Sequence, residues 1–569
     1  MSEVPPSREE ILRVLNSSVT VDQNDRTFEV GLVLGGTVSA GAYTAGFIDK
    51  FIEALDAWYG ARERGEQVPD HDVRLRVAAG TSGGAGCAAI LARALASSFP
   101  HATPTTDPAD LARNPFYACW VQDLDIRGMT DLSDISEDGQ LLSFLNGRAL
   151  DVATRKAVAF QGAPLPHDSW HCRPYVDNPF AVICALGNLT GVPYGIDFGN
   201  DRKQVYKSHA DFARFACDVS QNNDLTPEEV RADTFFVQQD GRGGAVNWMT
   251  LANYARASGA FPLAFPAIAL RRPRNHYDYR VAVVPGESGQ AEAWPLRPIW
   301  PESVDAETYS LLSVDGGTFN NEPIELARTH LSGPTGRNPR DRMEANRGVI
   351  LVDPLASSSD LGDAAFSDLF SLAGSLIDGV IGQGRYATSD LMMMADESVF
   401  SRYLVRPQRG VYGGEKALAT GGLGGFSGFF DEDYRHHDYM LGRANCRTFL
   451  LEEFALDENH LLFADWSDDQ RQLYGKAAGE GYLPVIPLVG KAAEPDGNVP
   501  WPKGQLTAER ARKLLEPRVV EIVEKIADDN FDTDLLTDPL IWKFKKPVAR
   551  RILEPFEKAF AKYLDEWQL

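Results

Sequence analysis

The chain has 569 residues, 44% of them hydrophobic and 24% charged, which is the composition of a globular protein with a large core. Its formal net charge of −24 excludes the broad basic surface that binds nucleic acid or coats an anionic membrane. No run of about 18 apolar residues occurs, and the N-terminus lacks the basic and apolar regions of a secretory signal. We therefore expect a cytoplasmic protein without a membrane span, whose contact with a lipid surface is local, peripheral and apolar.

Two strand–turn–helix units stand near the start of the chain. The apolar run 28–34 reads as a strand, glycines follow it, and residues 40–61 place apolar side chains at helical spacing. Residues 72–80 repeat the strand pattern, and an alanine-rich helix is expected over 85–98, where a Phe-Pro pair stops it. Successive units of this kind predict an α/β fold with a mostly parallel central sheet.

The middle of the chain alternates between irregular and regular patterns. Periodicity is weak between about 100 and 175, which predicts an inserted set of loops and short helices. Residues 180–198 then read as a buried strand and a turn, and 248–268 as a helix followed by a proline-bounded turn. Strand, turn and helix are expected over 308–329, and a further buried strand over 347–355.

After residue 356 the pattern becomes mainly helical. The clearest candidate helices are 366–382 and a charged run over 507–569. We therefore divide the chain into an N-terminal arm (1–27), an α/β domain (28–355) and a mainly helical C-terminal region (356–569).

The second predicted turn contains a motif typical of nucleophilic serines. Residues Gly80-Thr81-Ser82-Gly83-Gly84 form G-x-S-x-G between an expected strand and an expected helix. A nucleophilic serine needs a sharp turn that flanking glycines tolerate, and the helix N-terminus that follows stabilises developing negative charge. The alternative from the motif alone is an ordinary tight turn packed on small residues.

The first predicted turn, within residues 32–46, is also rich in glycine. Such a loop can point several backbone N–H groups at an anion, either a dinucleotide pyrophosphate or a tetrahedral oxyanion. The glycine spacing does not match the dinucleotide pattern G-x-G-x-x-G. The oxyanion hypothesis requires a nucleophile on a neighbouring strand–turn–helix unit, which Ser82 provides.

A carboxylate follows the expected strand at 308–315. Asp315 precedes Gly316-Gly317, where the carboxyl end of a strand opens onto the crevice in which α/β sheets bind ligands. There Asp315 could accept the proton of Ser82 directly. The alternative is an aspartate that only stabilises a turn.

Taken together, these motifs resemble the patatin-like phospholipase family, which carries a glycine-rich oxyanion loop, a G-x-S-x-G elbow and a D-G-[GA] turn in that order. The run from Asp315 through Asn320-Asn321 to Pro323 resembles the family's D-G-G-x-x-N-N-x-P. Residues 257–266, ASGAFPLAFP, resemble another family segment. Residues 114–126 and 437–446 resemble a bacterial patatin-related subgroup with long insertions and a helical C-terminal region.

The resemblance implies a three-layer patatin-like fold and a serine lipid acyl hydrolase of the phospholipase A or lysophospholipase type. It implies a catalytic dyad of Ser82 and Asp315 without histidine, an acyl-enzyme, a lipid or acyl-ester substrate, and neither metal nor organic cofactor. The oxyanion hole would be formed by the N–H groups of Gly36, Thr37, Val38 and Gly83. Two alternatives stay open: an esterase or thioesterase acting on soluble acyl substrates, and a weakly active lipid-binding scaffold.

The oxyanion loop departs from the family pattern G-G-G-x-R-G. This chain has Gly36-Thr37-Val38-Ser39-Ala40-Gly41, with Ala40 at the arginine position. Because β-branched residues disfavour positive φ, we expect ordinary backbone angles at Thr37 and Val38.

Several other residues are weaker candidates. A Ser–His–Asp hydrolase would use His330 or His460, and the pair His436-His437 is a candidate metal ligand, although no H-x-x-x-H is present. The Gly/Phe-rich segment 420–430 reads either as a mobile lid or as a packed turn, and we favour packing. The six scattered cysteines form no C-x-x-C, and we expect reduced thiols.

Overall fold

The computed structural model of the protein describes residues 5–19, 26–135, 140–198, 202–222, 225–239, 241, 244–320, 323–355, 388–497, 499–504, 506–530 and 539–569. The predicted helix over 366–382 and the motif residue Asn321 lie outside the described residues. Within the described residues, no helix is both long enough and apolar enough to cross a membrane.

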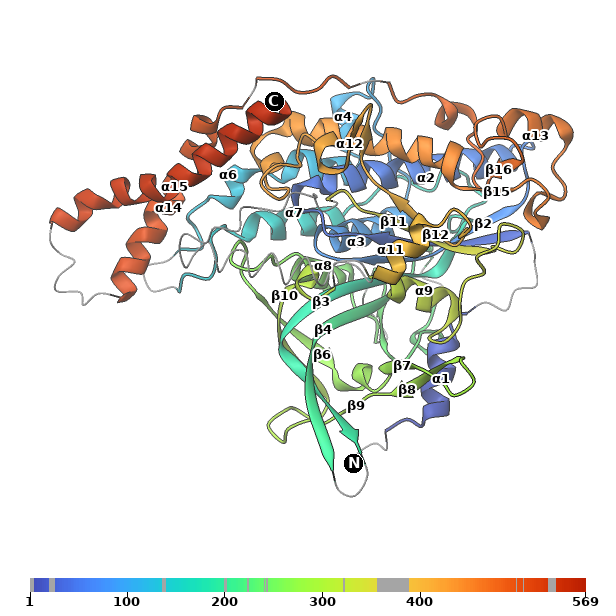
Figure 1. Ribbon diagram of the computed structural model, residues 1–569, viewed down its shortest axis with the longest axis horizontal. Coiled ribbons are helices and arrows are strands. Elements are labelled where there is room, and N and C mark those ends of the chain that lie inside the picture. The colour runs from blue at the N-terminus through green and yellow to red at the C-terminus, as the bar shows by residue number, and fades with distance from the viewer. Residues whose placement is uncertain are drawn as a thin grey trace.

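A ten-stranded sheet forms the centre of the protein (Figure 1). Its parallel part has the order β12 (Arg402–Val405), β11 (Arg347–Val352), β1 (Thr27–Leu34), β2 (Asp72–Gly80) and β3 (Val176–Asp197). Antiparallel strands β10 (Thr308–Asp315), β6 (Ile268–Pro273), β4 (Lys203–Cys217) and β9 (Arg297–Pro298) extend it, and β5 (Thr234–Val237) pairs in parallel with β4. Strand β1 is buried almost throughout, as expected for a strand covered on both faces.

Helices cover both faces of this sheet. On one face, α3 (Gly83–Leu95) and α8 (Trp248–Ser258) pack on the strands and α2 (Gly41–Glu63) packs beside α3. On the other face, α9 (Ile324–Ser332) packs on β1, β2 and β11. These layers confirm the predicted α/β fold with a mostly parallel central sheet.

Short helices occupy the region between β2 and β3. They are α4 (Pro108–Leu111), α5 (Pro115–Tyr117), a π-helical turn (Ala118–Asp123), α6 (Ile126–Met129) and α7 (Arg148–Val158). Helix α7 packs against α8 and α3, so this region adds to the layer that carries α3. The N-terminal segment forms α1 (Arg8–Asn16), and β7 (Val281–Pro285) pairs with β8 (Ala291–Pro295) as a separate hairpin.

Much of the chain after residue 387 is helical. Its helices are α11 (Thr388–Ala395), α12 (Glu432–Thr448), α13 (Asp468–Tyr474), α14 (Ala508–Asn530) and α15 (Pro539–Trp567), the last two drawn in red and projecting together in Figure 1. Short strands β13 (Gln408–Arg409) and β14 (Tyr412–Gly413) form a small hairpin, and β15 (Ala455–Asp457) and β16 (Tyr482–Pro484) pair as a separate two-stranded antiparallel sheet. The predicted domain boundary lies at residue 355. Strand β12 comes after this residue and pairs with β11, so the central sheet contains residues from both sides of the predicted boundary.

Helix α12 is bound closely to α2. A Cβ on Gly46 would lie 1.9 Å from the Tyr439 carbonyl oxygen, so only glycine permits this approach. Arg443 of α12 is fully buried and contacts two carboxylates of α2: Asp49 Oδ2 at 2.8 Å and Glu53 Oε2 at 2.6 Å. Arg443 and neighbouring groups hold the pKa of Asp49 down at about 2 despite burial, which alone would raise it. The C-terminal region is therefore joined to the sheet domain by a buried ionic contact.

One predicted element is wrong. We predicted a strand and then a turn over 180–198, but β3 is a single strand whose pairing with β4 shifts between Gly187 and Val192. Asn188 Oδ1 accepts the N–H of Gly191 at 2.9 Å, and Gly191 has φ +74°. Gly191 therefore lies in an irregularity within the strand and does not end it, because β4 pairs on both sides of this position.

Candidate active site

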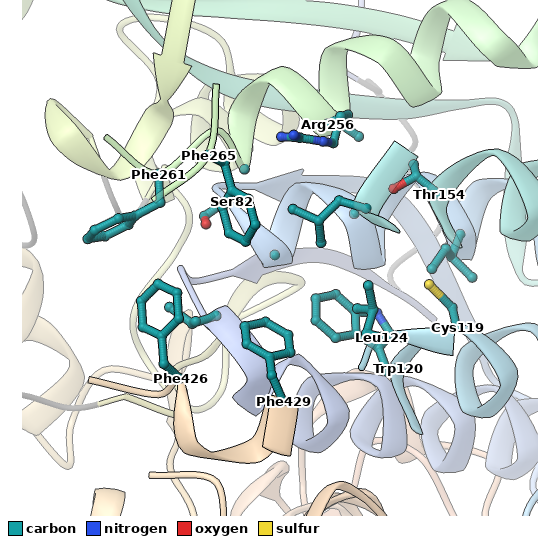
Figure 2. A pocket seen from close by; sticks show the side chains of 17 residues that line it. Ser82, Cys119, Trp120, Leu124, Thr154, Arg256, Phe261, Phe265, Phe426 and Phe429 are labelled. Carbon is teal, nitrogen blue, oxygen red and sulfur yellow. The ribbon is translucent and has the colours of Figure 1, made fainter. Parts of the chain in front are cut away.

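Ser82 lies on the sharp turn between β2 and α3. Its backbone has φ +54° and ψ −128°, a conformation that residues other than glycine rarely adopt and that neighbouring contacts must hold. The Ser82 N–H donates to Ser258 Oγ at 2.9 Å, and this hydroxyl donates to the Ala185 carbonyl at 2.6 Å. The turn is thus held from α8 and β3, and the Ser82 side chain lines a pocket (Figure 2).

The glycines after Ser82 permit a close approach of the first glycine-rich loop. A Cβ on Gly84 would lie 2.1 Å from the Leu34 carbonyl oxygen at the end of β1. A Cβ on Gly83 would lie 2.1 Å from Thr37 Oγ1. The two turns predicted from the sequence are therefore packed directly against each other, as the oxyanion hypothesis requires.

Four backbone N–H groups at this junction are available to a ligand. Within the part of the chain that the structure describes, no acceptor is present for the N–H groups of Gly36, Thr37, Val38 and Gly83. The next N–H group along the loop is already used, because the Ser39 N–H donates to the Gly425 carbonyl at 3.1 Å. Unused donors at a helix N-terminus are well suited to an oxyanion.

Our expectation of ordinary backbone angles in this loop is wrong at Val38. Val38 has φ +48°, whereas Thr37 has φ −128°. The physical reason is tertiary: the Ser39 N–H and hydroxyl both donate to the Gly425 carbonyl, which fixes the residue directly after Val38. A segment almost 400 positions away thus stabilises a conformation that the local sequence disfavours.

Asp315 ends β10 and is 3% exposed. Its Oδ1 accepts the Gly317 N–H at 2.7 Å, while its Oδ2 is buried and has no hydrogen-bond partner of standard geometry among the described residues. Burial raises the pKa of Asp315 to about 6, and the Ser82 hydroxyl, the Gly317 N–H and Arg256 limit that rise. The Ser82 hydroxyl is therefore one of the groups that favour the ionised form of Asp315.

The pocket that Ser82 lines is an apolar cavity of about 70 Å³. Phe261 and Phe265 lie above it in Figure 2, and Phe426 and Phe429 approach from the opposite side. Phe429 is 2% exposed, so the preferred prediction of packing for segment 420–430 agrees with the structure at this residue. The sequence did not predict that this packed segment forms a wall of the Ser82 pocket.

Arg256 of α8 is the charged residue among those that line the pocket, and sequence reasoning missed it. It is 6% exposed, its Nε lies 3.0 Å from Asp151 Oδ1, and its guanidinium lies 5.6 Å from the centre of the Phe265 ring. Burial lowers the pKa of Arg256, with Asp151 opposing this shift. The sequence feature that could have identified Arg256 as a site residue is its position directly before the ASGAFPLAFP segment.

The other candidate residues lie elsewhere. His330 lines a different cavity, and His460 Nδ1 accepts the Leu462 N–H at 3.0 Å. His436 Nδ1 lies 2.8 Å from the Tyr117 hydroxyl, and His437 Nδ1 lies 2.7 Å from an oxygen of the adjacent aspartate. No histidine lines the Ser82 pocket, and no group of three residues could hold a metal ion, as far as the described residues extend.

A strained serine between a strand and a helix, beside unused N–H groups and an apolar pocket, is the arrangement of serine acyl hydrolases. The model of the patatin-like phospholipase family matches residues 32–328, and this chain belongs to that family. The predicted family resemblance is thereby confirmed.

The chain has a relative among known sequences. It is 31% identical over 551 residues to the "Uncharacterized protein y4iI" of Sinorhizobium fredii (strain NBRC 101917 / NGR234), covering 89% of this chain and 76% of that protein. Among solved structures, VipD from Legionella pneumophila aligns with 65% of this chain and 54% of its own at 12% identity. The TM-score of that alignment is 0.15, which is too low to establish a shared fold.

Proposed function

We propose that this chain is a serine lipid acyl hydrolase of the phospholipase A or lysophospholipase type. Membership of the patatin-like phospholipase family supports hydrolysis of esters in general. The observation that carries the finer proposal is the position of the Ser82 hydroxyl beside the buried carboxylate of Asp315, on the wall of an apolar pocket. An apolar pocket suits a fatty-acyl chain because burial of its methylene groups stabilises the complex.

In the proposed reaction, Asp315 takes the proton of the Ser82 hydroxyl as Oγ attacks the ester carbonyl carbon. The carbonyl oxygen becomes an oxyanion, which accepts hydrogen bonds from the N–H groups of Gly36, Thr37, Val38 and Gly83. The ester C–O bond breaks, the alcohol leaves with the proton from Asp315, and an acyl-enzyme remains on Ser82. Water then attacks the acyl carbonyl carbon and gives one proton to Asp315. The bond between that carbon and Ser82 Oγ breaks, Oγ takes the proton back from Asp315, and the fatty acid is released.

The pKa of Asp315 suits this role. A carboxylate with an ordinary pKa is a weak base, whereas burial raises the pKa of Asp315 to about 6. At neutral pH the group is still mainly ionised, so it accepts a proton more readily than an exposed carboxylate does.

We therefore expect phospholipid hydrolysis to increase with pH through a midpoint near 6, because only ionised Asp315 accepts the Ser82 proton. The measurement is the rate of fatty-acid release from phosphatidylcholine vesicles at a series of pH values between about 4.5 and 8, spaced by about half a pH unit. A soluble ester with the same acyl chain, assayed in parallel, distinguishes a lipid hydrolase from an esterase.

Cleavage of the soluble ester alone would favour the esterase or thioesterase alternative, and cleavage of neither would favour the lipid-binding scaffold. A rate that does not change between pH 5 and 7 would exclude Asp315 as the base.

A second prediction concerns the junction of the two turns. In Gly83→Ala, the new methyl group would collide with Thr37 Oγ1 at 2.1 Å and with the Trp120 ring at 2.9 Å. We expect kcat/KM to fall at least roughly tenfold, because displacement of the loop removes oxyanion donors. Gly86→Ala on the same helix is the matched control, since its nearest neighbour is a Trp120 ring carbon at 3.7 Å.

We expect Gly86→Ala to retain activity and to be slightly more stable, because alanine favours the helix. Equal activities of the two variants would show that the contact between Gly83 and Thr37 does not position the oxyanion loop.

A further inference from the structure

A second cavity, of about 230 Å³, lies on the face of the sheet that α9 covers. Its walls come from β2, β3, β4, β5 and α9, and from the segment that follows α1. One water needs only roughly 10–15 Å³ of such space, so the cavity has room for a group of several heavy atoms. His330 of α9 lines this cavity. The cavity and the Ser82 pocket share no lining residue among the described residues, so they are separate.

Three arginines line this cavity, and two of them have carboxylate partners at contact distance. Arg76 Nη1 lies 2.5 Å from Glu29 Oε1, and the Arg76 guanidinium also contacts Asp177. Arg231 forms a two-pronged contact with Asp233, with Nε and Nη2 each 3.0 Å from a carboxylate oxygen. Paired guanidinium groups of this geometry are largely neutralised.

The third arginine, Arg214 of β4, is not satisfied in this way. Arg214 is 5% exposed, and its buried Nε–H donates no hydrogen bond to any described residue. The Asp233 carboxylate lies 3.6 Å from this Nε and is already engaged by Arg231. Burial, and then the charge of Arg231, lowers the pKa of Arg214 to about 9.

A buried guanidinium without hydrogen bonds is costly unless a partner is bound. Asp177 also lines the cavity but pairs with Arg76. Asp233 is shared between Arg214 and Arg231, so one carboxylate serves two guanidinium groups. Water filling the cavity would hydrate Arg214 but would not supply the missing negative charge. The His330 ring adds no charge, because burial and the three cavity arginines keep its pKa well below the ordinary value. The neutral His330 ring still carries one N–H group that can donate a hydrogen bond to an anion.

We propose that this cavity binds the phosphate group of a soluble small molecule, with Arg214 as the principal ligand and Arg231 beside it. A guanidinium fork matches the oxygens of a phosphate. The amide of Asn178 also lines the cavity; its Nδ2 donates one N–H to Asp218 Oδ1 and has a second N–H for a phosphate oxygen. This proposal does not depend on the hydrolase mechanism, because the site and its residues are separate from Ser82.

The test is isothermal titration of the full-length protein with inorganic phosphate at constant ionic strength. We expect saturable binding to the wild type and at least roughly tenfold weaker binding to Arg214→Met, because a charge-assisted hydrogen-bonding partner is lost. Arg271→Met is the matched control, since Arg271 is exposed on β6 of the same sheet. It should bind phosphate like the wild type.

Arg214→Met should also unfold at a temperature equal to or above that of the wild type without phosphate, because it removes a buried, unbalanced charge while Asp233 keeps Arg231. If it does not fold, Arg214→Lys carries the test; we expect weaker binding, because an ammonium cannot form the two-pronged contact. Phosphate binding that is equal in the wild type and both Arg214 variants would overturn the proposal.

A lipid headgroup presents the same phosphate chemistry. Phosphatidylcholine vesicles that contain phosphatidic acid test this source, and we expect co-sedimentation to be the same for wild type and Arg214→Met, because Arg214 is buried. Vesicle binding that requires Arg214, without binding of free phosphate, would overturn the assignment to a soluble molecule.

Discussion

The Ser82→Ala variant should lose ester hydrolysis by roughly 10⁴-fold or more while keeping the wild-type fold. Under the proposed mechanism the hydroxyl is the atom that bonds to the acyl group, so no other side chain can replace it. The backbone should tolerate the change, because alanine at φ +54° is strained to about the same degree as serine. The N–H that donates to Ser258 Oγ is also retained.

Labelling with a fluorophosphonate probe measures this directly, since the probe forms a covalent bond with an activated serine. We expect labelling of the wild type and none of Ser82→Ala. Ser310→Ala, at an exposed position on the strand that ends at Asp315, serves as the control and should label normally. Wild-type labelling that appears only with vesicles would indicate a site that opens at a lipid surface, whereas undiminished labelling of Ser82→Ala would refute the nucleophile.

The Asp315→Asn variant should show opposite effects on activity and stability. Hydrolysis should fall by roughly 10²–10⁴-fold, because the amide cannot accept the Ser82 proton. Stability at neutral pH should rise, because burial raises the pKa of Asp315 from 3.8 to about 6. The folded state therefore holds this proton more tightly than the unfolded chain does, and the carboxyl group destabilises the fold as pH rises through 6, by up to roughly 3 kcal/mol.

The apparent midpoint temperature of unfolding, measured at several pH values, tests whether ionised Asp315 destabilises the fold. Asp315→Asn should exceed the wild type at pH 7, and the difference should shrink as pH falls toward 4, where wild-type Asp315 is protonated in the folded state and about half protonated in the unfolded chain. The Asn side-chain oxygen can still accept the Gly317 N–H, so the turn should be preserved. A variant that loses activity and stability together at pH 7 would show that Asp315 has a structural role instead.

The sequence predicted the parts of the site that are local. The turn at Ser82 and the turn at Asp315 each follow an apolar strand, and the carboxyl ends of strands in an α/β sheet open onto one crevice. The glycines at positions 83 and 84 also belong to the local motif, although what requires them is a tertiary contact, the approach of Thr37 to Gly83 and of Leu34 to Gly84.

The missed features depend on contacts between distant residues. Val38 has positive φ because Ser39 is bound to Gly425, and no local pattern encodes that pair. The arginine charge in the pocket comes from α8 rather than from the oxyanion loop, where Ala40 stands. Phe426 belongs to a segment whose composition predicts packing but not the surface that it packs against.

The pocket wall formed by Phe426 and Phe429 has a consequence for the order of synthesis. The ribosome makes the chain from its N-terminus, so Ser82 and Asp315 exist long before the segment that closes the Ser82 pocket and fixes Ser39. A nascent chain that has just completed residues 32–328, the part matched by the family model, has both residues but an open pocket and an unsupported loop. The growing chain therefore cannot assemble the whole pocket until residue 429 has emerged.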